Sequence, residues 1–426
     1  YYCTNHSGMG SNVSIGANFT FNNDADPPNV TATPKSSLDV DTVIALSYPS
    51  GVFVKNDGSS FVGTAYTFAT RNLQNQLWVW GNNAAGGLGL NNITKYSSPI
   101  QVPGNRASLV KGYDGSSGCS ATIKTDGTLW ASGNNTNGQL GQNDRTQYSS
   151  PVQIPGTTWS QVSGAGRNNF MAVKTDGTLW AWGQNQYGNL GLPATPNTEY
   201  SSPVQIPGTT WSKIGSGFIA AMAIKTDNTL WSWGYNGNGQ LGQNNKVKYS
   251  SPIQIPGTNW NTLINAGGTG QGAIKTDGTL YVWGSNGNGE LGQNTNVTDY
   301  SSPIQIPGTT WVSASSGGAA ASAIKTDGTL WTWGRNHEGQ LGLNNRTEYS
   351  SPVQLPGTWS ISRNSSNSVS STMAIKTDNT LWAWGENIHG YDNTVVTKSS
   401  PVQIPGTTWT SVSLFNAGGF LAIKEG

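Results

Sequence analysis

The sequence predicts an all-β protein: a seven-bladed β-propeller with a small, irregular N-terminal extension. Three observations support this prediction. A unit of 49 to 52 residues recurs along the chain, each unit decodes into short strands joined by tight turns, and the last unit is truncated. Repeats of this length indicate an architecture in which one unit cannot bury its own faces and is covered by its neighbours.

The triplet Ser-Ser-Pro marks each unit and occurs seven times. Its first residues are Ser97, Ser149, Ser201, Ser250, Ser301, Ser350 and Ser399. The fullest copies continue into Val-Gln-Ile-Pro-Gly-Thr-Thr-Trp and, further on, contain Ala-Ile-Lys-Thr-Asp-Gly-Thr-Leu-Trp. Seven near-identical copies in one order predict seven equivalent structural units.

One copy illustrates the strands. Residues 323–325 and 330–333 read as two strands joined by the tight turn of Asp327 and Gly328. Residues 352–356 form a third short strand with a proline at each end, which predicts the outer edge of a sheet because proline cannot donate to a ladder. Such units fit propeller blades, and a β-solenoid with long coils is the competing architecture.

All 18 tryptophans occupy repeat positions. Six follow the Pro-Gly turn: Trp159, Trp211, Trp260, Trp311, Trp359 and Trp409. Six follow the repeat leucine: Trp78, Trp130, Trp180, Trp231, Trp331 and Trp382. Six precede the hairpin glycine: Trp80, Trp182, Trp233, Trp283, Trp333 and Trp384. This regularity favours packing between blades, and a sugar-stacking platform is the alternative.

The two ends of the chain predict how the ring closes. Residues 411–424 begin a further copy that stops before its Asp-Gly turn. We expect these C-terminal strands to complete the blade that holds residues 77–101, although residues 68–71 compete for one place. The propeller then spans residues 66–426, and residues 1–65 form the extension, interpreted as an attachment segment.

Composition narrows the class of protein. Only 10% of the 426 residues are charged and the net charge is +1, which argues against nucleic-acid binding. The sequence contains no run of 18 apolar residues, so it predicts no helix that spans a membrane. Cys3 and Cys119 are too few for a disulfide framework, and one bridge between them stays open.

The block Leu-Trp-x-Trp-Gly-x-Asn-x-x-Gly-Gln-Leu-Gly, at residues 230–242 and 330–342, resembles the regulator of chromosome condensation repeat family. The resemblance covers residues 66–426 and implies a seven-bladed propeller. The founding nuclear members act as exchange factors for a small GTPase and contact nucleosomes. The histidine that members often carry before the Ala-Ile-Lys strand is missing from residues 166–170, so a role as exchange factor or chromatin binder is disfavoured.

The near-verbatim Ser-Ser-Pro-Val-Gln-Ile-Pro-Gly-Thr-Thr-Trp copies are also similar to repeats in bacterial surface and phage structural proteins. This resemblance implies a structural, adhesive or receptor-binding module of a virion or cell surface, located outside the cell. Its partners would be a protein or cell-surface receptor and, through residues 1–65, other virion or surface proteins. A secreted protein that binds or inhibits one protein partner is the alternative.

Catalysis is not expected. The histidines His6, His337 and His389 lie far apart, and no nucleophile elbow, phosphate loop or metal-binding motif occurs, so we expect neither cofactor nor metal. His337 with Glu338 and His389 with Asp392 are the local histidine–carboxylate pairs. Both are interpreted as solvated loops rather than catalytic dyads.

Departures from the repeat are the candidate binding residues, because the repeated residues are explained by the fold. The candidates are Arg167, Asn169, Phe170, Tyr187, Phe218, Tyr235, Arg335, His337, Glu338, His389 and Tyr391. Neutral drift in loops is the competing explanation.

Overall fold

The computed structural model contains strands and turns and, within the residues that it describes, no helix. The described residues are 17–21, 30–34, 43–44, 50–54, 60–64, 68–69, 75–81, 83–105, 108–111, 118–164, 168–192, 198–216, 219–266, 270–296, 298–317, 319–364, 370–386, 396–414 and 419–425. The chain divides into two compact units, one of residues 1–74 with Gly426 and one of residues 75–425.

The first unit contains two small sheets. One has the strand order β1-β2-β4-β5, with β2 and β4 parallel, and the other pairs β3 with β6. Their strands are β1 (Ala17–Phe21), β2 (Val30–Pro34), β3 (Val43–Ile44), β4 (Ser50–Val54), β5 (Ser60–Thr64) and β6 (Phe68–Ala69). Because Phe68 pairs with Ile44, it takes no place in a propeller blade.

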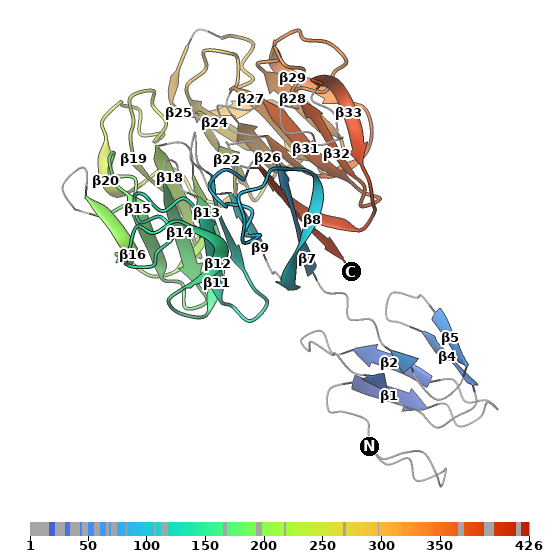
Figure 1. Cartoon of the computed structure of the whole chain (residues 1–426). Helices are drawn as coiled ribbons and strands as arrows, with labels where there is room; N and C mark the ends of the chain where they lie inside the picture. The colour runs from blue at the N-terminus through green and yellow to red at the C-terminus, as the bar shows by residue number, and fades with distance from the viewer. Residues whose placement is uncertain are drawn as a thin grey trace. The chain divides into compact units, whose positions relative to one another are not determined.

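The second unit is a seven-bladed propeller, which confirms the predicted fold (Figure 1). Six blades are each built from four strands taken in chain order. The first two blades are β9 (Ser108–Lys111), β10 (Cys119–Ile123), β11 (Leu129–Gly133) and β12 (Tyr148–Ile154), then β13 (Trp159–Gly164), β14 (Asn169–Lys174), β15 (Leu179–Gln184) and β16 (Glu199–Ile206). The next two are β17 (Trp211–Ser216), β18 (Ala220–Lys225), β19 (Leu230–Gly234) and β20 (Tyr249–Gln254), then β21 (Trp260–Leu263), β23 (Gly270–Lys275), β24 (Leu280–Gly284) and β25 (Tyr300–Ile306). The last two are β26 (Trp311–Gly317), β27 (Ala320–Lys325), β28 (Leu330–Gly334) and β29 (Tyr349–Leu355), then β30 (Trp359–Asn364), β31 (Ser371–Lys376), β32 (Leu381–Gly385) and β33 (Lys398–Ile404). The short β22 (Asn265–Ala266) pairs in parallel with β26.

The ring is closed by strands from both ends of this unit. The seventh blade combines β34 (Trp409–Leu414) and β35 (Gly419–Glu425) with β7 (Asn75–Gly81) and β8 (Tyr96–Asn105). Within it β35 pairs antiparallel with β7, and Ile423 lies opposite Leu77. The first strands of the blades contact one another in the order β9, β13, β17, β21, β26, β30, β34 and back to β9. This circuit agrees with the closure that the truncated last copy predicts and leaves no place for a solenoid.

The core lies between the blades. In one cluster Ile123, Leu129 and Ile154 of one blade pack against Trp159 and Trp182 of the next. Equivalent clusters of aliphatic side chains against tryptophans occur at five further blade contacts. At six blade contacts an aliphatic face therefore meets a tryptophan face, whereas the blade of β9 to β12 carries Ser132 where the other blades have the buried tryptophan.

The tryptophan that precedes the hairpin glycine also fixes the register between blades. Trp182 Nε1 donates to the Gln139 carbonyl of the preceding blade at 2.9 Å. The same bond joins Trp233 to Asn189, Trp283 to Gln240, Trp333 to Glu290 and Trp384 to Gln340. These indoles are fully buried, so the packing interpretation holds for them. The tryptophans that follow the repeat leucine are only partly buried.

The proline-flanked strand is the outer edge of each blade, as predicted. For example, β29 pairs only with β28, and the register between them shifts between Thr332 and Gly334. The repeat proline, Pro352 in this blade, lies at this irregularity, where no ladder donor is needed. Cys119 is buried in β10, whereas Cys3 lies outside the described residues.

Removing β35 tests the closure. A chain that ends at Asn416 loses the strand that pairs with β7 and leaves the aromatic face of the closing blade uncovered. We expect the melting temperature to fall by more than about 10 °C, measured by circular dichroism, since the ring loses several kcal/mol of burial. Removing only Glu425 and Gly426 is the matched control and should change it little. An unchanged melting temperature after the longer deletion would show that β35 does not close the ring.

Candidate functional site

Each blade presents two kinds of connection at opposite ends of its strands. One end carries the Asp-Gly and Pro-Gly turns. The other carries the loop between the third and fourth strands, which in the blade of β11 and β12 is residues 134–147. We call this second end the loop face. Its loops combine residues fixed by the fold with residues that differ from blade to blade.

A buried asparagine holds each of the six loops in which this position is described, and we call it the pin. Its Oδ1 accepts the backbone N–H of the leucine five residues later at 2.8–3.0 Å. These asparagines are at most 1% exposed: Asn83, Asn135, Asn185, Asn236, Asn286 and Asn336. Asn336 Nδ2 also donates to the Asn345 carbonyl at 3.0 Å and to the Thr347 carbonyl at 2.9 Å. One side chain therefore ties three parts of the loop together.

The pinned loop is also joined to the next blade. Gly339 has φ +72°, and a Cβ there would lie 2.5 Å from Ser399 Cα of the neighbouring outer strand. Asn344 N donates to the Ser399 carbonyl at 2.7 Å, and Ser400 Oγ donates to Asn344 Oδ1 at 3.0 Å. The repeated glycine, asparagine and Ser-Ser pair are thus explained by the contact between blades.

Three positions in each loop take no part in the two contacts just described, that of the pin and that of the glycine, asparagine and Ser-Ser pair. They are the residue before the pinning asparagine and the two residues after it, and we call them the variable positions. In the described loops they hold Ala84, Ala85; Asn134, Thr136, Asn137; Gln184, Gln186, Tyr187; Tyr235, Gly237, Asn238; Ser285, Gly287, Asn288; Arg335, His337, Glu338; and Glu386. All except Ala85 and Asn134 are exposed or partly exposed. A rigid support with differing surface side chains is suited to recognition.

Five of the candidate residues occupy variable positions on the described loops. Tyr187 and Tyr235 belong to adjacent blades and pack edge to face, with ring centroids 5.5 Å apart at 68°. Tyr235 lies over Gly237, where a Cβ would come within 2.1 Å of the tyrosine hydroxyl. The glycine therefore makes room for an aromatic pair that bridges two blades at the surface.

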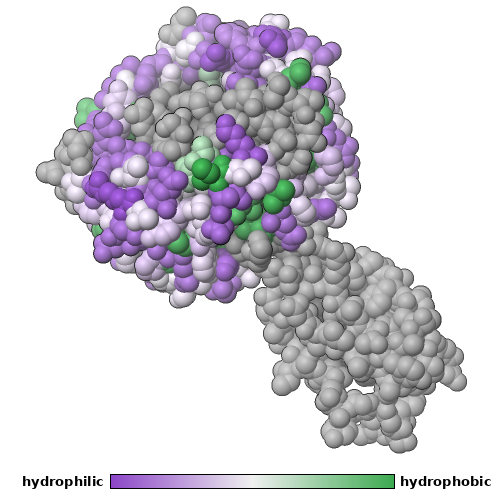
Figure 2. Space-filling model, viewed as in Figure 1, coloured by the Kyte–Doolittle hydropathy of each residue, from purple (hydrophilic) through white to green (hydrophobic). Residues whose placement is uncertain are grey.

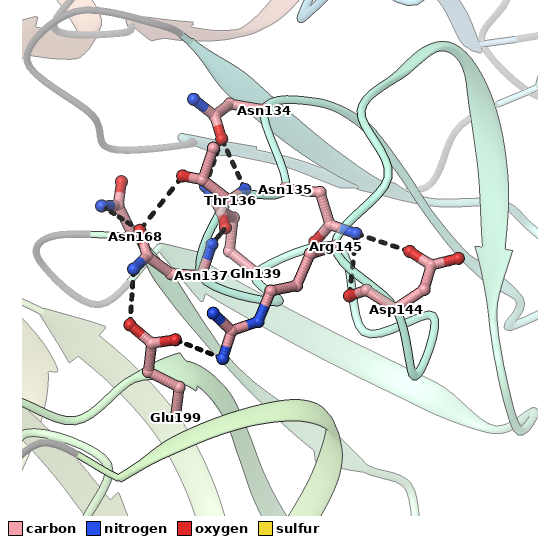
Figure 3. A network of polar contacts seen from close by, with 9 residues as sticks. All are labelled: Asn134, Asn135, Thr136, Asn137, Gln139, Asp144, Arg145, Asn168 and Glu199. Atoms are coloured by element: carbon pink, nitrogen blue, oxygen red, sulfur yellow. Dashed lines mark hydrogen bonds and ion pairs between the residues drawn. The ribbon is translucent and has the colours of Figure 1, made fainter.

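The contact between the two preceding blades is polar instead (Figure 3). Asn137 Nδ2 donates to Glu199 Oε1 at 2.6 Å, and Asn168 Nδ2 donates to Asn137 Oδ1 at 2.8 Å. Arg145 approaches Glu199 from the other side, with an N–O distance of 2.7 Å. The seams of the loop face thus differ in chemistry while their backbone support is the same.

Arg335, His337 and Glu338 lie together in one loop, but the histidine does not pair with Glu338. Arg335 Nε donates to His337 Nδ1 at 3.3 Å, and His337 Nε2 lies 2.9 Å from Glu348 Oε1. The His337 side chain is 58% exposed and that of Glu348 is 36% exposed. The carboxylate beside the His337 ring is thus that of Glu348 and not that of its sequence neighbour Glu338, and both side chains of the pair are exposed, in line with the expected solvated loop.

Two candidates are buried. Phe170 is 0% exposed and stacks on Trp182 with ring centroids 6.1 Å apart. Asn169 is 1% exposed and donates from Nδ2 to the Gln184 carbonyl at 2.9 Å. Both depart from the repeat because they fill space inside the blade, so neither side chain is available at the surface. The remaining candidates lie outside the described residues: Arg167, Phe218, His389 and Tyr391.

A buried carboxyl escaped the sequence analysis. Glu290 is 5% exposed and occupies the loop position that is glutamine in three other blades. Burial raises the pKa of its carboxyl, which accepts the Asn288 backbone N–H at 2.7 Å. The nearby charge of Asp299 raises the pKa further, to a smaller extent. The available signal was a glutamate in the Gly-x-Leu-Gly block, at a position that holds an uncharged residue in the other copies of the block.

No cluster of three or more metal-binding side chains occurs among the described residues. In that same part of the chain, no helix has the length and apolar character needed to cross a bilayer.

The chain is similar to the regulator of chromosome condensation (RCC1) repeat, which matches residues 126–173, 176–218, 227–271, 277–324 and 327–367. A second RCC1 repeat profile matches residues 159–189. The five repeats cover more than half of the chain, which therefore belongs to the RCC1 repeat family. A search of curated proteins finds no match.

Solved structures share the fold at low sequence identity. Human WBSCR16 is 20% identical with a TM-score of 0.72, covering 83% of this chain and 99% of that one. Prp20p from Saccharomyces cerevisiae is 17% identical with a TM-score of 0.73, covering 83% and 92%; its structure is described with its binding properties to Gsp1p and histones. The structure of Kap60 bound to yeast RCC1 (Prp20) is 16% identical with a TM-score of 0.70, covering 83% of this chain and 89% of that one.

Replacing a pinning asparagine or its sequence neighbour tests whether the pins stabilise the fold and the variable positions do not. Asn336→Ala leaves a buried leucine N–H and two carbonyls without their partner, and we expect the free energy of unfolding to fall by about 2–3 kcal/mol. Arg335→Ala, one residue away at a variable position, should change it by less than about 0.5 kcal/mol. Urea unfolding measures both. Equal losses would mean that the variable positions also support the fold.

The buried carboxyl predicts a pH-dependent stability. Because the folded-state pKa of Glu290 is raised, its contribution to stability is fully present below the unfolded-state pKa and is lost as pH rises through the folded-state pKa. Glu290→Gln keeps the shape and removes this loss. We expect the variant to be more stable than the natural protein at pH 7 and nearly equal at pH 4, measured by urea unfolding. The same difference at both pH values would contradict the assignment.

Proposed function

We propose that this chain is a non-enzymatic binding module that presents its loop face to a protein or cell-surface partner. Its setting is the outer surface of a phage virion or a bacterial cell, where it acts as a structural, adhesive or receptor-binding component. The observation that carries the proposal is the division of each loop into buried pins and surface variable positions. Because the buried pins keep the loop backbone constant, the surface side chains can differ between blades without loss of the fold, as a recognition surface requires.

The chemistry of the variable positions supports a binding role. An aromatic pair, Tyr187 with Tyr235, and an arginine–histidine–glutamate group around His337 are the kinds of side chain that anchor protein interfaces. No nucleophile accompanies His337 or the buried Glu290 in the described contacts, so the proposal contains no catalytic step.

Relatives and charge support the class of partner. The yeast relatives are described with protein partners, namely Kap60 for one structure and Gsp1p and histones for another. The net charge of +1 with 10% charged residues favours a neutral partner surface over nucleic acid. The surface in view in Figure 2 is mainly hydrophilic over the described residues, as a module exposed to water requires.

A secreted protein that binds or inhibits one soluble protein is the second candidate. The pair of Tyr187 and Tyr235 supports this second candidate as much as the first, since one buried aromatic contact is enough to anchor a single protein partner. The two candidates differ in where the protein resides.

Location and competition together test the proposal. Gold-labelled antibody against the chain should decorate the outside of intact virions or cells, and the purified full chain should block their attachment to the host. The double variant Tyr187→Ser, Tyr235→Ser should block at least tenfold less well, because the anchor pair is gone. Val312→Thr, an exposed position outside the loop face, is the matched control. Label confined to the culture medium would favour the second candidate, and label inside the host cell would overturn the proposal.

A further inference from the structure

An exposed glutamine recurs on the outer strand of all seven blades. The seven are Gln101, Gln153, Gln205, Gln254, Gln305, Gln354 and Gln403. Every one is exposed. Of these, only Gln305 has a side-chain hydrogen bond to another described residue. The contacts between blades that explain the repeated Trp, Asn, Gly and Ser do not involve these side chains.

Each glutamine lies beside a partly exposed aromatic ring. Gln205 pairs in register with Trp180 on the adjacent strand, so both side chains leave the same face of the sheet with Cβ atoms about 5 Å apart. The equivalent pairs are Trp78 with Gln101, Trp130 with Gln153, Trp231 with Gln254, Tyr281 with Gln305, Trp331 with Gln354 and Trp382 with Gln403. Where tyrosine replaces tryptophan, the Tyr281 hydroxyl donates to Gln305 Oε1 at 3.5 Å. In this pair the two side chains meet, and the shared register places the other six pairs in the same way.

In five of the blades the tryptophan ring is held by a hydrogen bond from its indole N–H to a threonine hydroxyl. Trp180 Nε1 donates to Thr178 Oγ1 at 2.9 Å, and Thr178 Oγ1 donates to Asp176 at 2.7 Å. Lys174 Nζ lies 4.5 Å from the centroid of the Trp180 ring. The ring is thus oriented before any ligand arrives, and the charges of the lysine and the aspartate offset each other at the site.

Exposure and repetition together point to a role for the glutamine. Exposed positions of the loop face differ between blades, so duplication of the unit has not kept the surface uniform. Glutamine has no special preference for strands, and apart from the Tyr281–Gln305 bond no side-chain hydrogen bond joins these amides to another described residue. An exposed amide that recurs seven times beside an aromatic ring, with one side-chain hydrogen bond to a described residue among the seven, is suited to binding something outside the chain.

We propose that each aromatic–glutamine pair binds one pyranose ring of a neutral glycan. The C–H face of a sugar stacks on an aromatic ring, and a glutamine amide both donates to and accepts from neighbouring hydroxyls. The offset charges favour a neutral sugar over an anionic one. Each shallow site binds weakly alone, and seven around one rim bind a polymer with avidity. This site is separate from the loop face and goes beyond the function proposed above.

The test uses the full chain on an array of neutral oligosaccharides, namely glucans, galactans, mannans and chito-oligomers. The best of these is then titrated while tryptophan emission is followed. We expect retention on the array and a change in emission on binding. The quadruple variant Gln205→Ala, Gln254→Ala, Gln354→Ala, Gln403→Ala should lose at least about 100-fold in apparent affinity for the polymer, because avidity is lost. A single Gln205→Ala change should cost only a few fold.

The matched control replaces four exposed apolar residues outside these pairs: Ile93→Thr, Val247→Thr, Val312→Thr and Val396→Thr. It should bind like the natural chain, and circular dichroism checks that both quadruple variants are folded. No retention on any neutral oligosaccharide, or equal binding by the glutamine variant, would overturn the proposal. Neither result bears on the loop face, which the tyrosine double variant tests by competition for attachment.

Discussion

The interaction on which the structure depends is the burial of an indole between blades. Each of five tryptophans, such as Trp182, lies against the aliphatic face of the preceding blade and donates to a loop carbonyl there. Burying about 200 Å² of such a side chain contributes roughly 5 kcal/mol as an upper estimate. A blade carries its tryptophans and its aliphatic side chains on opposite faces, so this contact always needs two blades. Stability is therefore a property of the closed ring, and β35 matters because it completes the last contact.

This arrangement explains where the chain is free to carry function. The indole bonds end on the loops of the loop face, and the buried asparagines then hold the rest of each loop against the next outer strand. Once the backbone is fixed in this way, the three variable positions contribute little to stability and are open to change. At the outer strands the same packing leaves one aromatic ring per blade partly exposed beside a glutamine. Two surfaces with different chemistry thus share one framework.

Sequence reasoning predicted the fold well because the repeat encodes it several times. The seven copies of Ser-Ser-Pro predicted the number of blades, Asp327-Gly328 predicted a hairpin, and the truncated last copy predicted the closure. It predicted the sites less well. A residue can depart from the repeat because it lies at the surface or because it fills space in the core, and the sequence does not distinguish the two. Phe170 and Tyr187 were therefore both candidate binding residues, although Phe170 packs against Trp182 and Tyr187 lies at the surface. The His337–Glu348 pair joins residues eleven apart across a pinned loop, and neighbours in the sequence could not reveal it.

Hydrogen exchange of the indole N–H groups tests the central claim most directly. In the natural chain labelled with ¹⁵N-tryptophan, the indoles of Trp182, Trp233, Trp283, Trp333 and Trp384 should exchange slowly and at one common rate, the rate of global unfolding. The partly exposed indoles, such as that of Trp180, should exchange much faster. Buried indoles that exchange at a different rate in each blade would show that blades open one at a time, and would contradict a ring held together as a single cooperative unit.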